Sequence, residues 1–311
     1  MANAHHRVIS ASRRTDIPAF FMPWFMEGIA RGEFEVTNPY NRRVTRVAAA
    51  APPVHTIVFW SKNFGPFLEG NYGGRLQAMG YHLYFQFTIN SENRILEPNL
   101  PGLDRRLGQL RRLCDRFGPR SVNWRFDPIC FYRSEGEGPF NNLGDAGRIA
   151  DAAAAAGIRR CTVSFMDLYA KIRKRTARRP GVAFVELPRE EKIEVLLGLE
   201  HRLKARHIRL FTCCESDLLS ALPARSTVRA GACIPSALFM ELHGGELSLK
   251  RDAGQRVKSG CGCRVSADVG SYDLHRCGHD CLYCYARSGG ESSPSSTQTA
   301  DASAGKGQHR R

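Results

Sequence analysis

The stretch AGRIADAAAAAGIRRCTVSFMD, residues 146–167, contains the repeating unit of this chain. Its alanine-rich first half predicts a helix, and the run RCTVSF at 160–165 predicts a short, mostly buried strand. The strand stops where Met166-Asp167 begins. A helix that leads into an apolar strand with a polar end is the pattern of an α/β protein.

The same order recurs along the chain. Strands are also predicted at 7–12, 56–60, 82–89, 121–126 and 208–213, and helix-like stretches lie at 20–32, 103–118 and 188–207. Six strands separated by helical segments predict a mostly parallel sheet. Right-handed crossovers then lead either to an open sheet or to a barrel.

Polar residues lie at or just past the carboxyl ends of these strands. They are Arg13, Arg14, Asp16, Lys62, Asn63, Asn90, Asp127, Asp167 and Glu215. In a barrel such ends converge on one mouth, where barrel enzymes carry their chemistry. Helix capping would explain some of the Asp and Asn residues but not the arginines and the lysine. We therefore predict an α/β fold over residues 1–235, a TIM-like partial or full (β/α) barrel.

The pattern changes after residue 235. Residues 236–252 predict a hairpin around His243-Gly244-Gly245, and a cysteine-rich segment follows and ends at residue 287. We expect residues 236–287 to pack on the barrel mouth. The low-complexity tail 288–311 predicts disorder.

The stretch RCGHDCLYCYAR, residues 276–287, holds the densest set of metal ligands. Its cysteines Cys277, Cys281 and Cys284 are spaced C-x3-C-x2-C, and Cys261 and Cys263 form a nearby CGC. Thiolates bind zinc and iron–sulfur clusters. The triplet favours an iron–sulfur cluster over the paired cysteines that are usual for structural zinc.

Some alternatives stay open in this segment. His275 and His279 could serve as zinc ligands together with the cysteines, so a zinc site is an alternative to the cluster. Cys261 and Cys263 would add a fourth ligand, hold a second cluster, or form a separate site with Cys233.

The triplet with Tyr283 resembles the cluster motif of radical S-adenosylmethionine (SAM) enzymes, and the YCYAR ending resembles the spore-photoproduct-lyase-like branch. In those enzymes three cysteines hold a 4Fe-4S cluster, SAM binds its open iron, and an aromatic residue like Tyr283 lies near the adenine. The segments ISASRRTDIPAF, NPYN, VFWSKN, WRFDPI and SFMDLYAK, with the final cysteines, resemble a bacterial family, domain of unknown function 1848, over residues 7–287. The resemblance implies a cluster at the C-terminal cysteines. In ordinary radical SAM enzymes the triplet follows the first strand, whereas here it follows all six.

We predict three groups of site residues. The metal ligands are Cys277, Cys281 and Cys284, with Cys261 and Cys263 as further candidates. The cofactor-binding residues are Tyr283, Arg13, Arg14, Asp16, Lys62 and Asn63. The catalytic residues are Arg125, Asp127 and Cys214.

Strand alternation and side-chain chemistry support these choices. Arg125 and Asp127 flank Phe126 and so share one face, as a ligand-orienting ion pair or a structural salt bridge at the rim. The arginines after the first strand suit a carboxylate or a phosphate, or anchor a neighbouring loop. Cys214 would ligate a metal or donate a hydrogen atom to a radical.

Charge and composition suggest partners and location. The chain carries a formal charge of +15 and has a sequence pI near 9.6, with its densest basic run at 171–179. This raises nucleic acid as a partner. Without an apolar run or a signal-like start, we expect a cytoplasmic protein with no membrane contact, whose eleven cysteines are thiols or metal ligands.

The function predicted from these observations is a radical-SAM-like iron–sulfur enzyme that acts on an unknown substrate at the barrel mouth. It would take electrons from a donor such as a ferredoxin or a flavodoxin. The alternative is a zinc-stabilised, basic nucleic-acid-binding protein without catalysis.

Overall fold

The structure is a computed structural model that describes residues 6–179 and 181–286. The tail that the sequence predicts to be disordered, 288–311, lies outside the described residues. Among those residues, no helix is both long and apolar enough to cross a bilayer.

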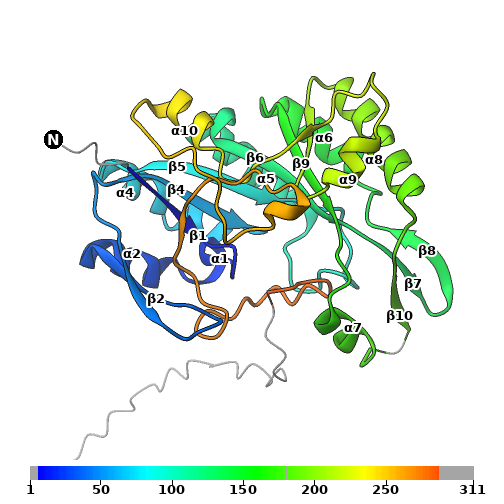
Figure 1. Ribbon diagram of the computed structural model, residues 1–311, viewed down its shortest axis with the longest axis horizontal. Helices are drawn as coiled ribbons and strands as arrows, with labels where there is room; N and C mark the ends of the chain where they lie inside the picture. The colour runs from blue at the N-terminus through cyan, green and yellow to red at the C-terminus, as the bar shows by residue number, and fades with distance from the viewer. Residues whose placement is uncertain (1–5, 180, 287–311) are drawn as a thin grey trace, which may run out of the picture.

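An eight-stranded sheet forms the centre of the molecule (Figure 1). Its order is β12-β11-β9-β6-β5-β4-β1-β13, and every pairing in it is parallel. The strands are β1 (Arg7–Ala11), β4 (Val54–Ser61), β5 (His82–Thr88), β6 (Val122–Ile129), β9 (Arg160–Phe165), β11 (Arg209–Thr212), β12 (Arg229–Ala230) and β13 (Ala267–Asp268). The six predicted strands are confirmed as its middle six, and they stand side by side in chain order.

The sheet is open. Within the described residues its strand pairings run from β12 to β13 without joining the two ends, so the structure does not show a closed barrel. β13 lies beside β1 through Ile9 and Ala267, which places the C-terminal segment on the edge of the same sheet.

Two small antiparallel sheets flank the central one, and the sequence patterns did not predict them. One pairs β2 (Glu33–Thr37) with β3 (Val44–Ala48), and the other has the order β10-β7-β8. The strands of the second are β7 (Phe131–Ser134), β8 (Glu137–Asn141) and β10 (Val182–Val185).

Helices connect the strands. They are α1 (Ile17–Phe20), α2 (Met22–Arg31), α3 (Gly65–Glu69), α4 (Tyr72–Ala78), α5 (Leu103–Phe117), α6 (Ala146–Ala155), α7 (Ala170–Thr176), α8 (Arg189–Lys204), α9 (Ser216–Ala221) and α10 (Ser236–His243), with single 3-10 turns η1 (Pro119–Ser121) and η2 (Val257–Ser259).

The core lies between the sheet and these helices. Phe59, Phe67 and Phe85 are fully buried and contact one another, with ring centroids 5.0–6.2 Å apart. Strand β4 is buried at nearly every position, which is typical of a parallel strand covered on both faces. The positions of the strand ends are therefore set by close packing.

The predicted hairpin at 236–252 is wrong, because residues 236–243 form helix α10. Gly244 ends the helix with φ 74°, and its N–H donates to the Met240 carbonyl at 2.8 Å. Phe239 anchors the helix on Tyr84, with ring centroids 4.9 Å apart. The Gly-Gly pair that suggested a turn is thus a helix C-terminus, where glycine is equally common.

Three histidines lie close together at the end of this helix: His243 of α10, His82 and His55. From their burial we predict that the stability of the protein depends on pH. The His82 and His243 rings stack 4.2 Å apart, and His55 lies 5.3 Å from His82. Burial and the neighbouring histidines lower the pKa of His243 from its ordinary 6.5 to about 4. The unfolded chain therefore takes up this proton at higher pH than the folded chain does.

The stability that His243 contributes is present above pH 6.5 and is lost as the pH falls toward 4. We expect the free energy of unfolding of His243→Gln to change less steeply between pH 6.5 and pH 4 than that of the wild type. The difference in slope should correspond to at most about one proton taken up on unfolding. Urea unfolding at a series of pH values measures this, with His201→Gln on the exposed face of α8 as the control. Identical pH profiles for wild type and His243→Gln would contradict it.

Candidate metal centre at the carboxyl edge of the sheet

Residues at the ends of three neighbouring strands form one connected polar group at the carboxyl edge of the sheet. Lys62 follows β4, Asn90 lies just beyond β5, and Asp127 lies near the end of β6. The Lys62 Nζ reaches the Asp127 carbonyl at 3.4 Å, and the Asn90 amide donates to the same oxygen at 3.2 Å. Three neighbouring strands therefore meet at one point.

Tyr283 lies in this group. Its hydroxyl receives hydrogen bonds from Lys62 Nζ and Asn90 Nδ2, both at 3.0 Å, and it donates one to Glu97. Lys62 also forms an ion pair with Glu97 at 2.7 Å. The predicted cofactor-binding residues Tyr283 and Lys62 are thus brought together, and each contacts a carboxylate that the sequence reasoning missed.

Glu97 is the buried anion of this group, with 3% of its surface exposed. Burial by itself would raise the pKa of Glu97, but the Lys62 ammonium and the hydrogen bonds from Lys62 and Tyr283 lower it overall. Burial, and then the Glu97 charge, raise the pKa of Tyr283 well above its ordinary value. The group therefore combines a carboxylate, an ammonium and a neutral phenol.

The three cysteines of the C-terminal motif lie in a tight loop against this group; we call residues 277–284 the triplet loop. Arg175 of α7 donates to the carbonyls of Cys281, Leu282 and Cys284 at 3.5, 2.8 and 3.0 Å. The Cys281 side chain is buried, whereas Cys277 and Cys284 are half-buried. Burial raises the pKa of Cys281, and the Lys62 charge opposes that shift.

The donor set of the triplet loop consists of three thiols, the ligand type that structural zinc sites and iron–sulfur clusters share. Among the described residues, no three Cys, His, Asp or Glu side chains already surround one ion position, and no thiol–thiol hydrogen bond joins Cys277, Cys281 and Cys284. The Lys62 charge acts on the Cys281 thiol and would offset part of the negative charge of three thiolates that hold a metal centre of either kind.

Asp16 links the triplet loop to the sheet. Its carboxylate accepts hydrogen bonds from His279 Nε2 at 2.7 Å, from the Ser61 hydroxyl and the Lys62 amide at 2.9 Å, and from the Ala19 amide at 3.0 Å. These donors occupy both oxygens, so Asp16 positions the loop. The other ring nitrogen of His279, Nδ1, is buried without a hydrogen-bond partner.

Arg13 and Arg14 contact the segment before the triplet loop. Arg13 donates to the Ser266 hydroxyl at 3.2 Å, and Arg14 donates to the Gly270 carbonyl at 3.0 Å. Both therefore act as loop anchors, which was one of the two roles expected for them. The Arg13 guanidinium also lies over the Trp60 ring, 5.3 Å from its centroid.

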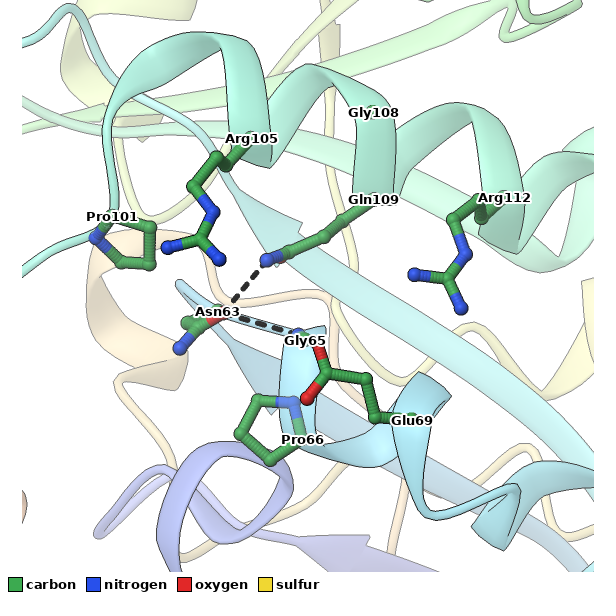
Figure 2. Close-up of a pocket in the computed structure, with 9 residues that line it drawn as sticks. All are labelled: Asn63, Gly65, Pro66, Glu69, Pro101, Arg105, Gly108, Gln109 and Arg112. Carbon is green, nitrogen blue, oxygen red and sulfur yellow. Dashed lines mark hydrogen bonds between the residues drawn. The ribbon is translucent and has the colours of Figure 1, made fainter.

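Asn63 does not join the group around Lys62. Figure 2 shows its side chain in a surface pocket of about 400 Å³ between α3 and α5. There it accepts hydrogen bonds from Gln109 Nε2 at 2.8 Å and from the Gly65 amide at 3.0 Å. The structure thus separates the Asn63 side chain from that of the adjacent Lys62, and among the described residues no hydrogen bond joins Asn63 to a cysteine.

The predicted Arg125–Asp127 ion pair is present, and both side chains leave β6 on the face opposite the buried Phe126. Ser164 of β9 donates to the Asp127 carboxylate, and Arg125 donates to the Cys233 Sγ at 2.6 Å. Burial would raise the pKa of Asp127, but Arg125 and the Ser164 hydroxyl lower it overall. The pair connects the Lys62 group to a second set of cysteines.

That second set contains Cys214, Cys261 and Cys263, the remaining cysteines predicted for the site. They lie with Cys213 and Cys233 in an apolar cluster that also includes Tyr84 and Ile234. The triplet cysteines are absent from this cluster, because Cys281 and Cys284 pack instead with Leu96 and Cys130. The chain therefore has two separate cysteine sites.

Glu215, three residues beyond the end of β11, is a carboxyl whose pKa rises to about 7, mainly through burial. It accepts a hydrogen bond from the Phe165 amide at 2.8 Å. A group with this pKa can both accept and release a proton near neutral pH.

Comparison with known proteins gave one family. The model of the family described as Domain of unknown function (DUF1848) matches residues 8–286. A search of curated proteins found no match.

Proposed function

We propose, starting from the fact that the chain belongs to the DUF1848 family, that it is an iron–sulfur enzyme of the radical-SAM type. Cys277, Cys281 and Cys284 would hold a 4Fe-4S cluster above the carboxyl edge of the sheet. The observation that carries this proposal is the position of the triplet loop, whose Tyr283 contacts Lys62 and Glu97 at the strand ends.

The cluster would supply one electron to SAM bound at its open iron, and the protein would hold and shield the reactants. Lys62 and Asn90 fix the Tyr283 ring by hydrogen bonds to its hydroxyl. Tyr283 is buried, with 6% of its surface exposed, and packs with Cys281 and Cys284, so the position of its ring beside the triplet cysteines is fixed.

The Arg125–Asp127 pair would orient the substrate. The Asp127 carboxylate is charged and accepts hydrogen bonds from Arg125 and Ser164. This side chain would therefore need little reorganisation when a ligand binds. Glu215 would exchange a proton with substrate or solvent, because its pKa of about 7 makes both of its forms available at neutral pH.

Basic residues of α7 lie beside the triplet loop and favour an anionic substrate or partner. Arg175 contacts the loop carbonyls, while Lys171, Arg173 and Lys174 are exposed on the same helix. The Lys171 ammonium lies 5.8 Å from the Tyr285 ring centroid. A nucleic acid bound here would lose affinity as the salt concentration rises.

Anaerobic reconstitution tests the proposed function. We expect about four iron and four sulfide per chain, a visible charge-transfer band, and release of 5′-deoxyadenosine when SAM and a strong reductant are added. A chain that takes up no iron contradicts the cluster. An iron-loaded chain that leaves SAM intact contradicts only the radical step, and zinc without sulfide at the triplet supports the nucleic-acid-binding alternative.

A further inference from the structure

Five cysteines from three separate segments meet at the same edge of the sheet, on the side of β11 and β12. Cys213 and Cys214 directly follow β11, and Cys233 lies three residues beyond β12. Cys261 and Cys263 precede β13. All five are free thiols, and we call them the thiol cluster.

The five thiols form a closed series of contacts. The Cys213 Sγ lies 3.7 Å from that of Cys214 and 3.8 Å from that of Cys233. Cys233 also interacts with Cys263, and the thiol of Cys261 interacts with those of both Cys263 and Cys214. Cys233, Cys261 and Cys263 are each at most 5% exposed, so these contacts are shielded from water.

Glycines allow the segments to approach this closely. A Cβ placed on Gly262, between Cys261 and Cys263, would lie 2.7 Å from the Gly231 carbonyl oxygen. A Cβ on Gly231 would in turn lie 2.8 Å from the Thr212 carbonyl oxygen. The backbones that carry the cysteines are therefore stacked at a separation that only glycine permits.

Cations surround the thiol cluster. Arg125 donates to the Cys233 Sγ at 2.6 Å, and the Arg13 charge acts on both Cys233 and Cys263. Both guanidiniums lie over the Trp60 ring, which fixes their positions. The charge of Arg256 interacts with the Cys214 thiol. Cations at these places would offset the negative charge that several thiolates carry.

We propose that the thiol cluster binds a zinc ion through four thiolates, as a closed structural site distinct from the triplet loop. In a tetrahedral zinc site with Zn–S bonds of about 2.3 Å, the sulfurs lie about 3.8 Å apart. The Sγ–Sγ distance of 3.8 Å between Cys213 and Cys233 matches that edge. Among the described residues no three Cys, His, Asp or Glu side chains already surround one ion position, so zinc binding would require the other thiols to rotate about their Cα–Cβ bonds.

Four of the five cysteines suffice. Cys233, Cys261 and Cys263 come from the two segments that the glycines hold together, and they supply three ligands. Cys213 and Cys214 are adjacent in the chain, so one of the two completes the set. The zinc would cross-link the segments that follow β11 and β12 with the segment that precedes β13. Each thiol would release its proton to solvent as it binds the metal.

Metal analysis of the anaerobically purified full chain tests this site independently of the triplet. We expect about one zinc per chain in the wild type, retained through dialysis against a weak chelator. Cys263→Ser and Cys233→Ser should each lose the zinc. Cys161→Ser, which alters a buried thiol of β9 outside both sites, should keep it.

The triplet variant Cys281→Ser separates this proposal from the proposed function, because it should retain zinc whether or not the wild type binds iron. Cobalt substitution of the wild type should give the visible bands of a tetrahedral thiolate site. Of Cys213→Ser and Cys214→Ser, only one should lose the metal. Circular dichroism of every variant separates loss of zinc from loss of folding.

Three results would overturn the proposal. The first is a zinc-free wild type that takes up neither zinc nor cobalt when they are added in excess. The second is about eight iron per wild-type chain that falls to about four in Cys263→Ser, which would make the thiol cluster a second iron–sulfur site. The third is a disulfide among these cysteines in the anaerobic protein.

Discussion

Cys281→Ser is expected to abolish iron binding at the triplet loop, reducing about four iron per reconstituted chain to nearly none. Cys281 is the most buried of the three triplet thiols, and its backbone carbonyl is held by Arg175. A serine oxygen is a harder donor that binds cluster iron weakly, and the shielded position leaves no room for a replacement ligand from solvent. The loss of the visible charge-transfer band measures the effect.

The matched control for this change is Cys114→Ala, which removes a buried thiol of α5 that belongs to neither cysteine site. It should keep the full iron content. If Cys281→Ser folds and still binds as much iron as Cys114→Ala does, the triplet loop is not the cluster site.

Glu97→Gln is expected to lower the free energy of unfolding by about 3–5 kcal/mol, the range for breaking a buried ion pair from one side. The amide keeps an acceptor for Tyr283 but removes the charge that Lys62 and Arg106 face. The Lys62 Nζ lies 2.7 Å from one Glu97 oxygen, and the Arg106 guanidinium lies 3.9 Å from the other. Arg106 is 1% exposed, so water cannot replace the carboxylate there.

Denaturant unfolding of wild type and variant at pH 7 measures this difference. The control is Glu241→Gln, which breaks the exposed ion pair with Arg120 and should cost no more than about 1 kcal/mol. Equal losses for the two variants would show that the Lys62–Glu97–Arg106 group does not stabilise the edge of the sheet.

Periodicity allowed the main elements of this fold to be predicted. Apolar runs such as 56–60 and 82–89 became β4 and β5 because their residues are buried on both faces, and chain order alone gave their sheet order. Strands β12 and β13 have two residues each, which is too short to carry a pattern. The edges of the sheet, and hence its openness, could not be predicted from the sequence.

The candidate site was partly predictable for a related reason. Lys62 and Asp127 follow strands, so their meeting could be expected, and the triplet is visible in its spacing. Glu97 lies in the long loop after β5, and its role depends on cations supplied by β4 and α5. Its only sequence signal was an isolated carboxylate in an otherwise apolar and proline-containing run, LEPNLP. A site of Cys233 with Cys261 and Cys263 was one alternative that the sequence left open. The tertiary structure adds Cys213 and Cys214, which lie about fifty residues before Cys261 and Cys263 in the chain.

The pairing of β1 with β13 also has a consequence for synthesis on the ribosome. Ser10 and Asp268 are neighbours in the sheet, yet they are 258 residues apart in the chain. At elongation rates of roughly 5–20 residues per second, β13 is synthesised on the order of tens of seconds after β1, and the outer edge of β1 stays unpaired until then. During that time its unpaired backbone groups are open to other nascent chains. A chaperone that covers β1 as it emerges would protect an edge of the sheet that can be completed only after residue 268 has been translated.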